Sequence, residues 1–146
     1  MSRMRKILVA YDGSPHSKEA LNWAIDLSLL TQAKIVAVKV FEGNQLFMAA
    51  ETGGTRFLEA LEEMRREDAR LMEEAATIGA SRGVAVTGEV LQGNVAAEII
   101  AFATKNNIDL IVTGTKGHGA LAELLMGSVT RNLISLAHVP VLVVKD

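Results

Sequence analysis

The sequence predicts an α/β protein with a parallel sheet that is covered by helices on both faces. Short apolar segments rich in β-branched residues alternate with segments whose apolar residues recur at helical spacing. The apolar segments are continuous, which is typical of strands buried on both faces. Strict alternation of strands and helices implies right-handed crossovers between parallel strands. The predicted strands cover residues 7–11, 34–41, 84–91, 110–113 and 141–144.

The first strand is followed by a helix with a clear start signal. The strand ends at Asp12-Gly13, and Ser14 is expected to cap the helix. Pro15 suits its first position, where the missing N–H costs nothing. Apolar residues at helical spacing then extend the predicted helix to about Thr31.

A long helix is predicted over residues 56–82, after a flexible glycine-containing stretch at residues 43–55. Arg70 and Glu74 are expected to form an i,i+4 ion pair on its solvent side, and Gly83 is expected to end it. Its expected buried stripe consists of Phe57, Leu61, Met64, Leu71, Ala75 and Ile78. The apolar Leu46-Phe47-Met48 in the preceding stretch is either a helix-cap contact or part of a partner surface.

Two further helices complete the pattern. Gly93-Asn94 is expected to cap a helix that begins at Val95, and a short helix is expected over residues 128–137. Pro140 separates that helix from the last strand. We find no linker and no internal repeat, so residues 1–146 are predicted to form a single domain.

Composition excludes several classes of protein. The 146 residues are 49% hydrophobic and contain no cysteine, which excludes a disulfide scaffold and a thiolate nucleophile. The formal net charge of −2 argues against binding to nucleic acid. No apolar stretch approaches the roughly 20 residues of a membrane span. The N-terminus lacks a signal-peptide core, so a cytoplasmic location is expected.

The most informative segment follows the fourth strand. Parallel α/β sheets bind ligands beyond the carboxyl ends of their strands, and here a glycine-rich loop precedes the helix that Gly127 and Ser128 open. Free N–H groups and the helix dipole favour a phosphate at such a helix start. Ser128 and Thr130 would add hydroxyl donors, and Lys116 a positive charge. From these residues alone, an ordinary loop end with a helix cap remains equally possible.

Known phosphate and catalytic motifs do not explain this segment. No glycine is followed by lysine, which excludes a P-loop. Residues 117–122 match a loose dinucleotide fingerprint, but the match follows the wrong strand and lacks the acidic residue about 20 positions later. A hydrolase elbow, G-x-S-x-G, is absent. A flavin site and a receiver domain are also disfavoured, because the aromatic and acidic residues that they need are missing.

Three segments together resemble the universal stress protein family. The spacing Gly114-x2-Gly117-x9-Gly127-Ser128 is similar to the nucleotide signature of that family. Residues 7–14 and 139–144 resemble its first and last strands. The resemblance covers essentially the whole chain.

This resemblance implies an open five-stranded sheet of strand order 3-2-1-4-5, with an adenine nucleotide, expected to be ATP, between strands 1 and 4. Val40 would contact the adenine, and Asp12 would face the ribose and a nucleotide-bound Mg²⁺. The implied nucleotide-binding residues are Ala10, Tyr11, Asp12, Val40, Thr113, Gly114, Lys116, Gly117, Gly127, Ser128, Val129 and Thr130.

The expected function is stress-response or regulatory signalling by nucleotide occupancy. No residue set is found that would orient an attacking water, so hydrolysis is expected to be slow or absent. The alternatives are a weak ATPase that a partner activates and a binder of another adenine nucleotide such as AMP. A homodimer is also expected through the last strand, residues 141–144, because the family order places this apolar strand at a sheet edge.

Overall fold

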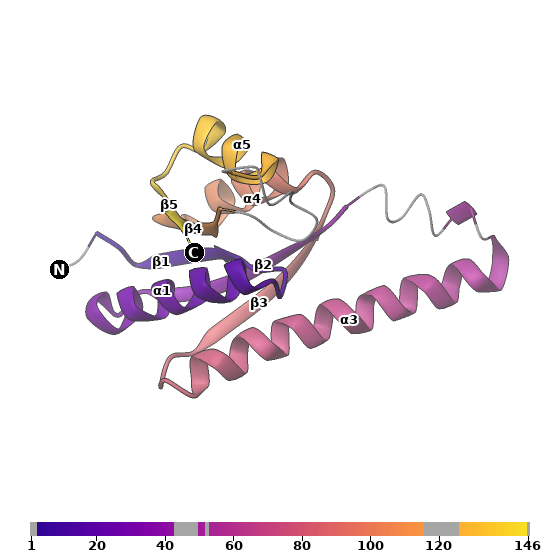
Figure 1. Cartoon of the computed structure of the whole chain (residues 1–146), viewed down its shortest axis with the longest axis horizontal. Coiled ribbons are helices and arrows are strands. Elements are labelled where there is room, and N and C mark those ends of the chain that lie inside the picture. The colour runs from indigo at the N-terminus through magenta and orange to yellow at the C-terminus, as the bar shows by residue number, and fades with distance from the viewer. Residues whose placement is uncertain (1–2, 43–49, 52, 116–125, 146) are drawn as a thin grey trace.

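The computed structural model describes residues 3–42, 50–51, 53–115 and 126–145. Within them, five strands form one sheet in the order β3-β2-β1-β4-β5, and every neighbouring pair is parallel (Figure 1). The predicted fold class and strand order are confirmed. The strands are β1 (Lys6–Ala10), β2 (Lys34–Phe41), β3 (Val86–Gln92), β4 (Leu110–Gly114) and β5 (Val141–Val144).

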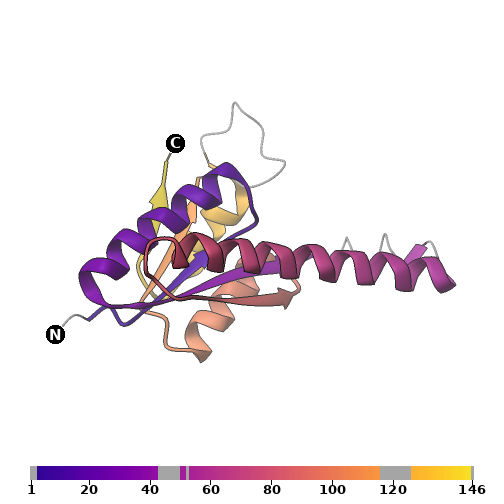
Figure 2. The same cartoon turned by 90° about the horizontal axis from the view of Figure 1, so that it is seen from below.

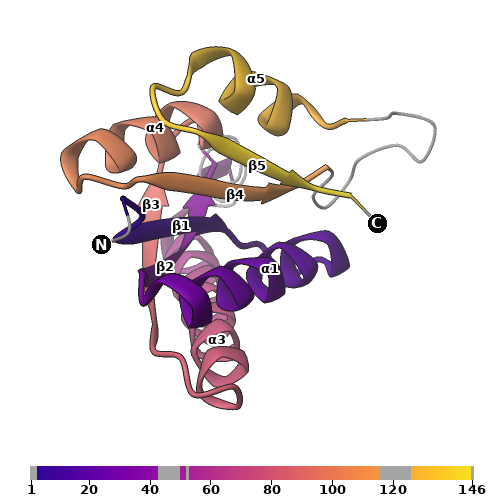
Figure 3. The ribbon, with the colours of Figure 1, turned by 90° about the vertical axis from the view of Figure 1, so that its left-hand side faces the viewer.

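Four helices cover the two faces of this sheet in the described part of the chain. One face carries α1 (Pro15–Thr31) and α3 (Gly54–Ala80), and the other carries α4 (Val95–Lys105) and α5 (Ser128–Leu136) (Figure 3). Successive residues of β1 face opposite ways: Ile7 packs into the core below α1 and α3, and Leu8 into the core below α4 and α5. Both residues are fully buried, as the continuous apolar pattern predicted.

Side-chain caps start α1 and α4 where the sequence predicts them. The Ser14 hydroxyl accepts a hydrogen bond from the N–H of Ser17 at 3.2 Å, and Pro15 occupies the first turn. The Asn94 side-chain oxygen accepts one from the N–H of Ala97 at 3.0 Å. These caps satisfy N–H groups that have no acceptor within the helix.

The long helix α3 begins and ends two residues earlier than predicted. In the second half of its expected buried stripe, Ala75 is fully buried, and Leu71 and Ile78 pack partly buried against the core. The other expected residues lie in the first half of the helix, which projects past the sheet (Figure 2). Gly83 has a φ of +76° and its N–H bonds to the carbonyl of Ala80, so it closes the turn after the helix. The contact expected for residues 46–48 lies outside the described residues.

None of the helices in the described ranges is both long enough and apolar enough to cross a membrane.

Candidate functional site

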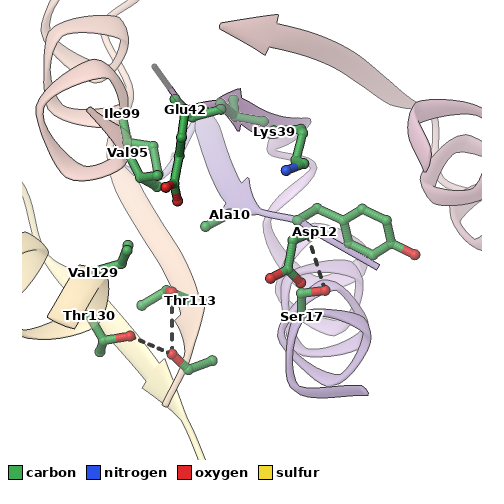
Figure 4. A pocket seen from close by; sticks show the side chains of 14 residues that line it. Ala10, Asp12, Ser17, Lys39, Glu42, Val95, Ile99, Thr113, Val129 and Thr130 are labelled. Atoms are coloured by element: carbon green, nitrogen blue, oxygen red, sulfur yellow. Dashed lines mark hydrogen bonds between the residues drawn. The ribbon is translucent and has the colours of Figure 1, made fainter. Parts of the chain in front are cut away.

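A cavity of about 140 Å³ opens where the carboxyl ends of β1 and β4 lie side by side (Figure 4). From β1 the chain continues through α1 to β2 on one side of this point, and from β4 through α5 to β5 on the other. A crevice between connections that diverge in this way is where open α/β sheets bind their ligands. The predicted site residues that line it are Ala10, Tyr11, Asp12, Val40, Thr113, Gly114, Val129 and Thr130.

One end of the cavity is apolar. Val38 and Val40 of β2 form one wall and are almost fully buried. Val95 and Ile99 of α4 form another, close to Ala10 at the end of β1 (Figure 4). This end offers flat apolar contact to a ring.

Two threonines shape the opposite end of the cavity. Thr130 Oγ1 donates a hydrogen bond to the carbonyl oxygen of Gly114 at 2.8 Å, and Thr113 Oγ1 donates to the same oxygen at 3.3 Å (Figure 4). The Thr130 hydroxyl was expected to donate a hydrogen bond to a ligand. In the structure its proton ties α5 to β4, so the hydroxyl is left as an acceptor.

Charged side chains also line the cavity, and the carboxylate of Glu42 lies beside Val95 (Figure 4). Asp12 is oriented by the N–H of Ser14, which donates to its Oδ1 at 2.9 Å. Its own N–H donates to the hydroxyl of Ser17 at 3.3 Å. Lys39 and Glu42 also line the cavity, and Lys39 is the one cation among its described lining residues.

Tyr11 serves packing in addition to bordering the cavity. Its side chain is 1% exposed in the core below α1 and α3, and its hydroxyl donates to the carboxylate of Glu74. Burial, reinforced by Glu74, raises the pKa of Tyr11 above its usual range. The ion pair predicted between Arg70 and Glu74 is not found among the described residues. Instead, Oε1 of Glu74 lies 3.6 Å from Nζ of Lys18 in α1.

Gly114 also has a packing role. A Cβ at this position would lie 2.8 Å from the Cβ of His16 and 2.9 Å from its carbonyl oxygen. The first turn of α1 therefore approaches β4 closely enough to require glycine. The resemblance to the nucleotide signature includes this glycine, but it did not predict the contact with α1.

The start of α5 supplies backbone N–H groups beside the cavity. Gly127 has an ordinary φ of −72°, and its N–H donates to the carbonyl of Thr115 at 2.7 Å, so this group is already used. The N–H groups of Ser128, Val129 and Thr130 have no acceptor within the helix. Val129 and Thr130 line the cavity. Lys116 and Gly117 lie outside the described residues.

Six of the lining residues were not among the predicted nucleotide-binding residues. They are Ser17, Val38, Lys39, Glu42, Val95 and Ile99. Lys39 and Glu42 lie at the predicted end of the second strand, and this position at the ligand-binding edge of the sheet is the signal that points to them. Val95 was predicted as the first residue of its helix, and Ile99 lies one turn further along the same helix.

Comparisons with known proteins agree with this architecture. The family model described as Universal stress protein family matches residues 4–145. Universal stress protein MJ0531 of Methanocaldococcus jannaschii is 34% identical over 141 residues, which cover 97% of this chain and 82% of that protein. The solved structure of the hypothetical protein MJ0577 is 27% identical, with a TM-score of 0.85 over 99% of this chain and 98% of its own.

Two more distant solved structures share the fold and contain adenine nucleotides. A universal stress protein in complex with cAMP is 21% identical, with a TM-score of 0.70 over 99% of this chain and 98% of its own. One from Archaeoglobus fulgidus in complex with dAMP is 18% identical, with a TM-score of 0.66 over 98% of each chain.

The signature spacing from Gly114 to Ser128, the strand order of the sheet and the match over residues 4–145 all agree. The chain belongs to the universal stress protein family.

Proposed function

We propose that this protein binds an adenine nucleotide in the crevice between β1 and β4. The observation that carries the proposal is the position of the cavity, which lies at the point of the sheet where the connections diverge. The cAMP and dAMP complexes of proteins with the same fold support the choice of an adenine nucleotide.

The two ends of the cavity suit the two ends of a nucleotide. In our proposal the adenine lies against Val40, Val95 and Ile99, and the ribose lies near Asp12. The phosphates extend to the N-terminus of α5, where the helix dipole and the N–H groups of residues 128–130 favour negative charge. A volume of about 140 Å³ is smaller than the roughly 300 Å³ or more of typical ligand pockets. The described residues therefore enclose only part of a nucleotide, such as its base.

ATP with Mg²⁺ is the form that we propose for the ligand. Mg²⁺ is commonly held by one or two carboxylates together with phosphate oxygens. Asp12 fits this role, because it borders the cavity and is oriented by Ser14. Outside the segments that the structure leaves undescribed, no three acidic or histidine side chains are grouped to hold a metal alone. The metal would consequently arrive with the nucleotide.

We further propose that the protein acts by nucleotide occupancy. The described cavity presents Asp12, Lys39 and Glu42, but no arrangement that would both activate a water and stabilise the charge of phosphoryl transfer. A weak ATPase completed by a partner, or a binder of AMP, is the alternative.

Mass spectrometry of the small molecules released by denaturing the freshly purified protein tests the proposal. We expect an adenine nucleotide in an amount close to one per chain. A preparation without nucleotide that also fails to bind ATP, ADP and AMP in calorimetry would overturn it.

We propose in addition that β5 pairs with its copy in a homodimer. The strand lies at the sheet edge. The carbonyl oxygens of Pro140 and Val144 accept hydrogen bonds from the N–H groups of Ile111 and Thr115, which belong to β4 and the residue after it. Backbone groups alternate in direction along a strand, so Leu142 also directs its backbone groups toward β4. The backbone groups of Val141 and Val143 therefore point outward, where an antiparallel copy could satisfy them.

A further inference from the structure

A second cavity, of about 560 Å³, lies on the α3 face of the sheet, behind the proposed nucleotide site. Asp12, Lys39 and Glu42 border both cavities. Its remaining walls combine acidic side chains of α3 with apolar ones, among them Phe41 of β2. The proposed function does not use this cavity.

The most unusual residue of the second cavity is Asp68. It is 7% exposed and is the one charged residue among the described buried side chains. It has no hydrogen bond and no ion pair within 4.0 Å among the described residues. No fully enclosed side-chain N or O atom of the described, non-exposed residues lacks a partner, so the unpaired Asp68 oxygens are not fully enclosed. Asp68 lines this cavity and also a neighbouring one that Arg65 and Gln92 border.

An isolated carboxylate in such a place is costly unless a cation accompanies it. Burial raises the pKa of Asp68, and the ammonium of Lys39 opposes that rise without forming a close pair. Glu67, the preceding residue in the chain, adds a second negative charge at the same cavity. The cavity thus carries more negative than positive charge.

The arrangement of these groups favours an extended organic cation. A single chelated metal ion does not fit, because the described acidic side chains nowhere come together in threes. Met64 and Leu71 of α3 line the cavity beside the two carboxylates and offer apolar contact. Methylene groups gain free energy on such a surface while ammonium groups reach the carboxylates.

We propose that this cavity binds a linear aliphatic diamine or polyamine. One ammonium group contacts Asp68 and another lies at Glu67, and the methylene chain between them packs on Phe41, Met64 and Leu71. The Asp68 carboxylate thereby obtains the charge-assisted hydrogen bonds that the protein itself does not provide.

Calorimetry with spermidine at pH 8 tests the proposal. The titration is carried out without nucleotide, because polyamines pair with free triphosphates. We expect one spermidine per chain, bound more tightly than the monoamine butylamine. Asp68→Asn should weaken binding by about tenfold or more, the loss expected for one charged hydrogen bond. Glu63→Gln removes an exposed carboxylate of the same helix and should leave the affinity unchanged.

Lys39→Met supplies a second variant with an effect of opposite sign. Removing the ammonium that repels the ligand should tighten spermidine binding, an outcome that damage to the fold cannot produce. Equal spermidine affinities in the wild type and Asp68→Asn would overturn the proposal, as would equal losses in Asp68→Asn and Glu63→Gln. Because nucleotide is absent, these results are independent of the nucleotide-binding proposal.

Discussion

The hydroxyl of Tyr11, the residue that follows β1, donates a hydrogen bond to the carboxylate of Glu74 in the C-terminal third of α3. The two residues are 63 positions apart in the sequence. This bond fastens the long helix to the strand end from which the candidate site begins. It also explains why a tyrosine stands at a buried position that a phenylalanine could fill.

Tyr11→Phe is therefore expected to lower the free energy of unfolding at pH 7 by about 1.5 kcal/mol, the lower end for a hydrogen bond to a charged group, since Glu74 is partly exposed. Urea denaturation measures the change. Lys18→Met, which removes only the exposed ion pair to Glu74, should cost less than about 1 kcal/mol. A larger effect at Lys18 than at Tyr11 would contradict the assignment.

The hydrogen bond between Tyr11 and Glu74 also predicts that the free energy of unfolding depends on pH in the alkaline range. The folded-state pKa of Tyr11 is raised above the unfolded value of about 10. Its stabilising contribution is therefore complete below pH 10 and is lost as the pH rises above it, because the unfolded chain ionises first. From pH 9 to 11 the unfolding free energy should fall more steeply for the wild type than for Tyr11→Phe. Parallel profiles would show that the phenol is not perturbed.

Gly114→Ala should destabilise the protein even without nucleotide. The added Cβ would meet the Cβ and the carbonyl oxygen of His16 at 2.8 and 2.9 Å, and the backbone of α1 cannot move without disturbing its cap. We expect a loss of about 1–3 kcal/mol, as for other overpacked sites. Thermal unfolding of the nucleotide-free protein measures it. An unchanged melting temperature would mean that Gly114 is required for ligand binding alone.

Gly127→Val is expected to weaken ATP binding by about tenfold or more, because a side chain at the start of α5 obstructs the approach of phosphate. The backbone φ of −72° suits valine, so the fold should persist with at most the loss of a favourable cap residue. Isothermal calorimetry compares it with Ser135→Val, an exposed change near the other end of α5. Equal ATP affinities in the wild type and Gly127→Val would show that the phosphates do not bind at the start of this helix.

ATP turnover by the purified protein should be slower than about one per second, the lower end of typical enzyme rates. The reason is that the described cavity lacks the groups for phosphoryl transfer. A phosphate-release assay with Mg²⁺ checks this. Faster release that Asp12→Asn abolishes would make the protein an ATPase and overturn signalling by occupancy.

Val143→Pro should convert the proposed dimer into a monomer. The substitution removes an N–H that points out of the sheet and leaves the bonds between β5 and β4 in place. Light scattering on both proteins gives the mass. The matched control is Val90→Pro on β3, the opposite edge strand. The N–H of Gly93 bonds to Phe41 of β2, and backbone groups alternate in direction along a strand. The N–H of Val90, three residues earlier, therefore points away from β2. Dissociation by both substitutions, or by neither, would contradict pairing through β5.

Much of the fold follows from local patterns in the sequence. The bounds of β2, residues 34–41, and of α1, residues 15–31, agree with the predicted ones. Continuous apolar runs and cap residues such as Ser14 act over a few positions, so a single segment contains the whole signal. The strand order came from the family resemblance, and with it the expectation that Asp12 and Gly114 lie at one site.

Only the tertiary structure decided which segments far apart in the chain contact each other. No local pattern shows that Glu74 receives the Tyr11 hydroxyl, that Thr130 donates its proton to Gly114, or that Asp68 is buried beside a cavity. Helical periodicity marks which side of α3 is polar on average, but not which polar residue meets the end of a strand. That depends on how far the helix is shifted along the sheet, and the close packing of both elements sets this shift.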